Sequence, residues 1–132
     1  MIETVTAPDG QVLAYFIQAS VLPDETRFLT PSDCNLQVGQ VVYPAGGEIA
    51  RHMHLPLERH IVGTTEVLMV QRGRCVVDVY GEDRRIVATR ELSVGDILIA
   101  VGGGHCFRVL EDTVLLEIKQ GPYPGGAEKE RF

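Results

Sequence analysis

Short segments of alternating apolar and polar residues, separated by turn residues, run along the whole chain. In the stretch Val114–Lys119, for example, Glu117 and Lys119 share one face and alternate with the apolar Leu116 and Ile118. The chain has 14 glycines and 7 prolines, and they are spread over its full length. No long stretch sustains the i, i+3, i+4, i+7 apolar spacing of a helix. The pattern predicts an all-β fold, a sandwich or a barrel, with at most one short helical turn in residues 22–33.

The turn residues divide the chain into a series of expected strands. The clearest hairpin joins Glu66–Gln71 to Arg74–Tyr80 through a turn at Gly73, and Leu55–Thr65 is expected to be a loop. The other expected strands are Val12–Ala19, Val38–Tyr43, Glu48–His54, Arg85–Leu92, Ile97–Val101, His105–Leu110 and Val114–Lys119.

The length and composition fit one ordinary globular domain. A chain of 132 residues is long enough to bury a hydrophobic core. We expect a single domain over residues 1–132, with N-terminal strands in 1–43, the main core in 44–119 and an irregular arm in 120–132. No apolar run approaches the roughly 20 residues that span a bilayer. The first ten residues contain neither a basic segment nor an apolar one, so no secretory signal is expected.

Charge and cysteine usage narrow the classes of partner. The net charge is -6 and the isoelectric point is about 5.1, and the arginines are interleaved with acids instead of forming a basic stripe. Nucleic acids and anionic membranes are therefore not expected as partners, whereas a small-molecule or metal site is compatible with this charge. The cysteines Cys34, Cys75 and Cys106 lie far apart, so we expect a reduced, cytoplasmic protein.

Three features carry candidate chemistry. His52 and His54 are two residues apart, and on a strand both imidazoles would point to one side, as metal ligands or as ordinary surface histidines. Glu66 begins a strand whose same-face neighbours Leu68 and Val70 are apolar, so it is either exposed at the strand end or buried with a metal partner. His105 follows three glycines on an apolar face, where a single histidine is more often a core residue than a ligand.

Taken together and in order, these residues resemble the two motifs of the cupin superfamily. Gly46, five residues, His52-x-His54 and then Glu66, six residues, Gly73 are similar to the first motif, G-x5-HxH-x3,4-E-x6-G. Gly95, an apolar strand, a glycine cluster and His105 are similar to the second motif, G-x5-PxG-x2-H-x3-N. The resemblance implies a jelly-roll barrel, also called a double-stranded β-helix. It also implies a metal site formed by His52, His54, Glu66 and His105.

The sequence departs from these motifs at three places. Eleven residues separate His54 from Glu66, where the motif has three or four, so Leu55–Thr65 is interpreted as an insertion. Glu58 has the motif's spacing from His54 and is the alternative carboxylate ligand. In the second motif, Val101 stands where proline is expected and the glycine cluster is one residue shorter, while Val109 replaces asparagine.

The resemblance also implies a range of functions. Imidazole and carboxylate ligands suit one divalent transition metal, namely Fe, Mn, Ni or Zn. Similar cupins include dioxygenases and isomerases or epimerases that act on small polar metabolites or sugar derivatives, and others that bind small molecules without catalysis. Glu117, Lys119 and Arg59 are the candidate catalytic residues, provided that their side chains face the site. Small cupins commonly dimerise through sheet edges, so a homodimer is expected.

Overall fold

The protein is an all-β structure, seen here in a computed structural model that describes residues 2–132. The chain divides into two compact units, one made of Met1–Val21 with Thr64–Phe132 and the other of Leu22–Gly63. Within the described residues there is no helix, and thus none long and apolar enough to cross a membrane. The predicted all-β class is confirmed, whereas the short helical turn expected in residues 22–33 is absent.

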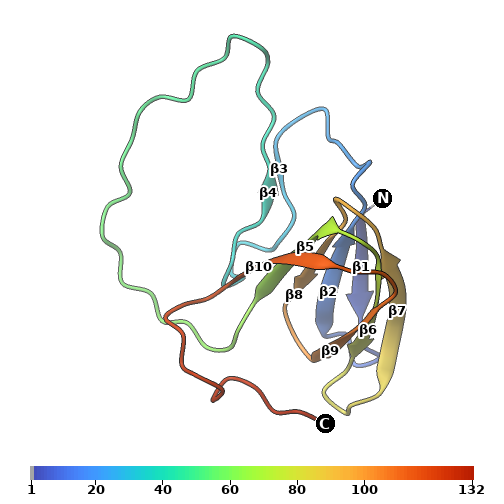
Figure 1. Cartoon of the computed structure of the whole chain (residues 1–132). Helices are drawn as coiled ribbons and strands as arrows, with labels where there is room; N and C mark the ends of the chain where they lie inside the picture. The colour runs from blue at the N-terminus through green and yellow to red at the C-terminus, as the bar shows by residue number, and fades with distance from the viewer. Residues whose placement is uncertain (1) are drawn as a thin grey trace. The chain divides into compact units, whose positions relative to one another are not determined.

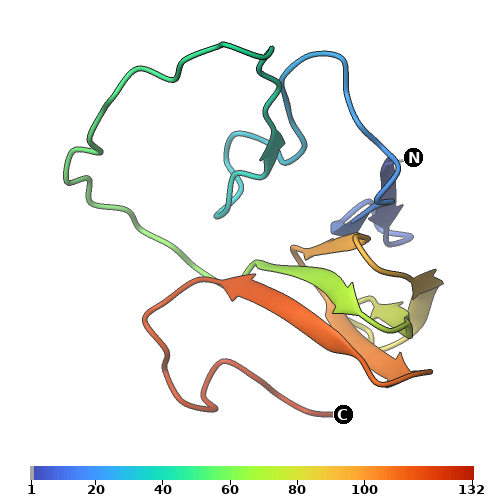
Figure 2. The same ribbon diagram turned by 45° about the horizontal axis from the view of Figure 1, so that its top comes forward.

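The first unit contains two antiparallel sheets (Figures 1 and 2). One sheet has five strands in the order β1-β2-β8-β5-β10, and the other has three in the order β7-β6-β9. The strands are β1 (Ile2–Thr6), β2 (Val12–Ile17), β5 (Glu66–Arg72), β6 (Cys75–Tyr80), β7 (Ile86–Leu92), β8 (Ile97–Ala100), β9 (Gly104–Val109) and β10 (Val114–Lys119). The second unit has one short pair, β3 (Arg27–Phe28) and β4 (Gly39–Gln40).

The two larger sheets share one hydrophobic core. Leu68, Val70 and Leu98 from the five-stranded sheet cluster with Val77 and Val79 from the three-stranded sheet, and all are at most 5% exposed. Because alternate residues of a strand point to opposite faces, these positions define the inner face of each sheet. The packing is that of a β-sandwich, and within residues 2–132 no sheet closes into a barrel.

The expected hairpin at Gly73 is wrong. β5 pairs with β8 and β10, whereas β6 pairs with β7 and β9, so Gly73 carries the chain from one sheet to the other. Its φ is +84°, and a Cβ there would collide with the backbone carbonyl of Asp112, which explains the glycine. A local turn pattern shows that the chain reverses, but the pairing of each strand depends on residues far away in the sequence.

The structure also differs from the sequence predictions near the N-terminus and in the second unit. The strand β1 was not anticipated, and it pairs with β2 across the turn at residues 7–10. Val38–Tyr43 is reduced to the two residues of β4, and Glu48–His54 forms no strand. A strand needs a neighbour to satisfy its backbone N–H and C=O groups, and the apolar pattern of Glu48–His54 does not supply one. The remaining predicted strands are present within one or two residues of their expected bounds.

Candidate functional site

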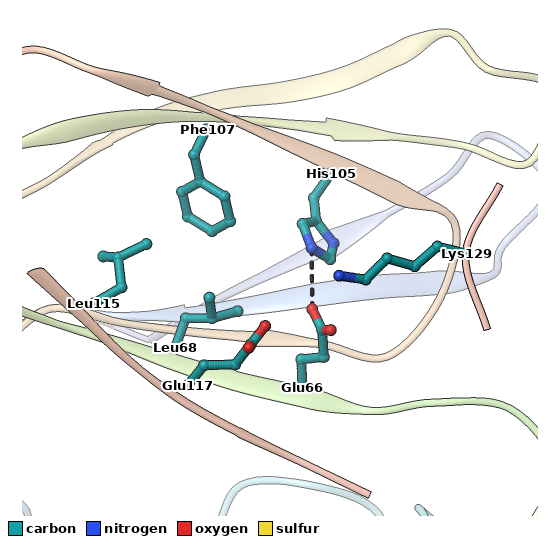
Figure 3. Close-up of a pocket in the computed structure, with 7 residues that line it drawn as sticks. All are labelled: Glu66, Leu68, His105, Phe107, Leu115, Glu117 and Lys129. Atoms are coloured by element: carbon teal, nitrogen blue, oxygen red, sulfur yellow. Dashed lines mark ion pairs between the residues drawn. The ribbon is translucent and has the colours of Figure 1, made fainter. Parts of the chain in front are cut away.

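A pocket of about 330 Å³ lies in the first unit, between the edge of the five-stranded sheet and strand β9 (Figure 3). Its floor is apolar and is formed by Leu68, Phe107 and Leu115. Four polar side chains complete the lining: Glu66, His105, Glu117 and Lys129. Pockets of this volume are at the lower end of the range that binds small metabolites.

The inner faces of the strands bring these side chains together. Glu66 points to the same side of β5 as the buried Leu68, and it lies opposite Ala100 of β8, whose small side chain leaves room beside it. Across the pocket, His105 and Phe107 lie on the inner face of β9, where they pair with Val79 and Val77 of β6. The alternation that builds the core therefore also directs Glu66 and His105 toward each other.

Glu66 and His105 form the central contact of the pocket. The Nε2 atom of His105 lies 3.0 Å from Oε2 of Glu66, and the residue Glu66 is only 7% exposed while the His105 side chain is 29% exposed. The hydrogen bond from His105 lowers the pKa of the Glu66 carboxyl below its ordinary value, although burial opposes this effect. The positive charges of Lys119 and Lys129 lower this pKa further. Glu66 is thus a buried carboxylate that is kept ionised by its surroundings.

The other two charged positions of β10 have different environments. Glu117 lies opposite Leu68 and lines the pocket, with its carboxylate directed toward the Glu66–His105 pair (Figure 3). Lys119 lies opposite Glu66, but its Nζ is 2.8 Å from Oε1 of Glu128. The hydrogen bond to Glu128 raises the pKa of the Lys119 ammonium, and nearby carboxylates add to this rise. Of the two predicted catalytic candidates on β10, Glu117 faces the pocket and Lys119 is engaged in an ion pair beside it.

Lys129 is a pocket residue that the sequence did not reveal. It belongs to the C-terminal arm, residues 120–132, which the composition identified only as an irregular segment. Its side chain extends toward Glu66 and His105 in Figure 3. A lysine between two glutamates, as in Glu128-Lys129-Glu130, is common on protein surfaces, so no local pattern marks it as part of a site.

The predicted histidine pair lies in the second unit. The ring centroids of His52 and His54 are 5.3 Å apart, in an edge-to-face arrangement with an interplanar angle of 72°. The carbonyl oxygen of Ala50 is 2.9 Å from Nδ1 of His52, and because a carbonyl can only accept, Nδ1–H is the donor. In the neutral ring, Nε2 of His52 therefore carries a free lone pair, which is the form that binds a metal.

The loop after the histidine pair is exposed. Glu58, Arg59 and His60 all have exposed side chains in the second unit, and none of them lines the pocket of the first unit. The four predicted metal ligands are thus found as two close pairs, Glu66 with His105 and His52 with His54. In residues 2–132 no group of three or more His, Cys, Asp or Glu side chains is arranged to hold a metal ion. The four-ligand site stays a prediction.

The Glu66–His105 pair has the spacing that two ligands of one ion need. Oxygen and nitrogen ligands lie about 2.1 Å from a transition metal, so two ligands at right angles are about 3.0 Å apart. The observed separation of Oε2 and Nε2 is 3.0 Å. An N–H···O hydrogen bond has the same length, so the position of the proton on the ring, at Nε2 or at Nδ1, decides between the two arrangements. A neutral Nε2 with a free lone pair presents a ligand, whereas an Nε2–H donates to the carboxylate.

None of the three cysteines contributes to this pocket. Cys75 is buried in the core, where burial raises the pKa of its thiol, and Cys106 is exposed on the opposite face of β9 from His105. Cys34 lies in the second unit, and all three are free. The candidate ligands are therefore oxygen and nitrogen donors, as the sequence predicted.

Comparisons with protein-family models, with curated proteins and with solved structures find no match for this chain.

Proposed function

We propose that this chain is a cupin-type metalloprotein whose pocket holds one divalent transition metal ion beside a small polar ligand. The observation that carries this proposal is the buried, ionised carboxylate of Glu66, held 3.0 Å from the imidazole nitrogen of His105 at the pocket wall. A carboxylate removed from water costs several kcal/mol unless it is paired or coordinates a metal. The jelly-roll topology and the contribution of His52 and His54 as further ligands rest on the motif resemblance.

The polar lining favours an enzyme over a passive binding protein. A bound metal ion supplies Lewis-acid or redox chemistry to a small substrate. In this pocket Glu66 and His105 would hold the ion, while the Glu117 carboxylate can accept or return a proton on a neighbouring molecule. These groups suit a dioxygenase, or an isomerase or epimerase, that acts on a small polar metabolite or sugar derivative.

One observation favours the alternative function, a binding protein without catalysis. Three of the lining side chains are apolar, namely Leu68, Phe107 and Leu115, so the pocket can retain a ligand by burial alone. Glu117 discriminates between the two functions because only catalysis requires a proton-transfer group. Turnover that depends on Glu117, with ligand affinity unchanged in Glu117→Gln, would support the enzyme.

Metal analysis of the full-length protein tests the proposal. Wild type, Glu66→Ala and His105→Ala would be dialysed against equal Zn(II) or Ni(II) and then measured for bound metal per chain. We expect about one ion per wild-type chain and a clear loss in both variants. Glu111→Ala is the matched control, because Glu111 is an exposed carboxylate that pairs with Arg74 away from the pocket.

The metal content of each variant shows which residues are ligands. If Glu66→Ala and His105→Ala retain the wild-type metal content, the proposal is wrong. A further loss in His52→Ala and His54→Ala would support the four-ligand prediction, and unchanged content in these two variants would contradict it.

A further inference from the structure

Every second residue near the end of the C-terminal arm, namely Glu128, Glu130 and Phe132, contacts the rest of the first unit. Glu128 pairs with Lys119 of β10 at 2.8 Å, and Glu130 pairs with Arg84 at 3.3 Å. At the end of the arm, the ring of Phe132 packs edge-to-face on Tyr80 with 5.1 Å between centroids. The arm is therefore held on both sides of Lys129.

The ring of Phe132 packs against β9 at Gly104, where there is no side chain. A Cβ at Gly104 would lie 3.1 Å from the Phe132 ring, so the glycine allows the ring to approach β9 closely. The guanidinium of Arg84 also lies over this ring, 5.2 Å from its centroid. These contacts fix the end of the arm beside His105, the next residue along β9.

Lys129 brings a cation with no ion-pair partner into the pocket. Within the described chain, residues 2–132, its ammonium makes no ion pair, whereas the other lysine, Lys119, is paired with Glu128. The pocket is partly open to solvent and Lys129 is an exposed residue at its wall, so its ammonium is accessible to an incoming ligand. Such a cation is well placed to meet an anionic group of a ligand.

The charge of the pocket decides whether it can bind an anion. Among the glutamate and lysine side chains of the lining, Glu66 and Glu117 contribute two negative charges and Lys129 one positive charge. The pocket without metal is therefore negative overall and repels anions. A divalent ion on Glu66 and His105 reverses the sign and leaves Lys129 as a second positive group. The apolar floor then fits the hydrocarbon part of the ligand.

We infer that Lys129 is the anion-anchoring residue of this pocket, and that the ligand is a small carboxylate with an apolar body. The inference rests on the proposed function, because it needs the metal to make the pocket positive. The docked arm belongs to the binding site, since it is the arm that holds Lys129 at the pocket wall.

Calorimetric titration of the zinc-loaded, full-length protein with phenylacetate tests this inference. The ring of phenylacetate matches the floor of Leu68, Phe107 and Leu115, and its carboxylate matches the ammonium of Lys129. Removing one charge-assisted hydrogen bond weakens binding by roughly ten- to a hundredfold. We expect that loss for Lys129→Met with zinc content unchanged, and partial recovery for Lys129→Arg.

Several controls separate charge from packing. 2-Phenylethanol has a similar shape without the charge, so Lys129→Met should leave its affinity unchanged. Arg131→Met removes a cation from the same arm that does not line the pocket, and it should bind phenylacetate as wild type does. Phe132→Ala removes the anchor of the arm and should weaken phenylacetate binding although Lys129 is retained.

The readouts distinguish failure of this inference from failure of the proposed function. If wild type binds zinc but not phenylacetate, or if Lys129→Met binds phenylacetate as tightly as wild type, the inference is wrong and the metal site stands. Equal weakening of phenylacetate and 2-phenylethanol in Lys129→Met would also overturn it. If wild type binds no zinc, the proposed function fails first, and the anion site that depends on it fails as well.

Discussion

The substitution Glu66→Gln separates the carboxylate's role as a metal ligand from its role in packing. Glutamine has nearly the same shape, and its amide oxygen can still accept a hydrogen bond from Nε2 of His105, which lies 3.0 Å from the carboxylate. The metal-free variant should therefore fold as wild type does. What changes is the ligand charge, because a neutral amide binds a divalent ion far less tightly than a carboxylate does.

The expected size of the effect follows from binding linkage. At a metal concentration of about 100 times the Kd, binding stabilises the folded protein by about 2.7 kcal/mol. For a chain of 132 residues, each kcal/mol raises Tm by roughly 3–5 °C, so wild type should gain about 8–13 °C. Loss of a residue next to a ligand already costs about 10- to 100-fold in metal affinity, and loss of the ligand itself should cost about 100-fold or more. At the same metal concentration, Glu66→Gln should then gain only about 1–2 °C.

Thermal unfolding with and without Zn(II) or Ni(II) measures this difference. Glu111→Gln is the control, since Glu111 pairs with Arg74 outside the pocket, and it should show the full wild-type rise. Glu58→Gln tests the alternative carboxylate that the motif spacing leaves open. A wild-type rise in Glu66→Gln together with a lost rise in Glu58→Gln would transfer the ligand role to Glu58 and refute the argument from the pocket.

Three further predictions concern the scaffold that positions the pocket. Leu98→Ala should lower the free energy of unfolding by about 2–5 kcal/mol in chemical denaturation, because Leu98 is fully buried on a central strand of the larger sheet. Gly103→Ala should lower it by more than about 1 kcal/mol, since φ there is +61° and the added Cβ would strike a backbone carbonyl of β6, and a wild-type value would contradict this reasoning. The hydrogen bond from Thr89 and the ion pair with Arg108 lower the pKa of the buried Asp78 carboxyl below its ordinary value. Its contribution to stability is therefore present above pH of about 4 and is lost as the pH falls through the lowered pKa, so urea unfolding of Asp78→Asn should depend less on pH in the acidic range.

The alternation of apolar and polar residues was sufficient to predict the all-β class and most strands of the first unit. Val114–Lys119 and Cys75–Tyr80 are strands at nearly the expected bounds, because a period of two is a local property of the chain. The same local reasoning failed for Glu48–His54, which has apolar residues but no partner strand. It also failed for the hairpin at Gly73, where both strands exist but pair with others.

Part of the candidate site was predictable for the same local reason. Glu66 and His105 were chosen as polar residues on apolar strand faces, and the structure brings them into contact because those faces meet in one core. Glu117 was one of two charged residues predicted to share a face, and it lines the pocket. The sequence could not show which of the two lines the pocket, because Lys119 forms an ion pair with Glu128 of the arm.

The sequence by itself determined the class of fold and the side of each strand on which a polar residue lies, since side-chain direction along a strand follows from backbone geometry alone. Only the tertiary structure decided which strands are neighbours, because pairing depends on the burial of residues that are distant along the chain. The same is true of Lys129, whose position in the pocket depends on the contacts of Glu128, Glu130 and Phe132 with residues up to about fifty positions away. No local pattern around Lys129 contains those contacts, and for that reason the pocket's cation became visible only in the folded chain.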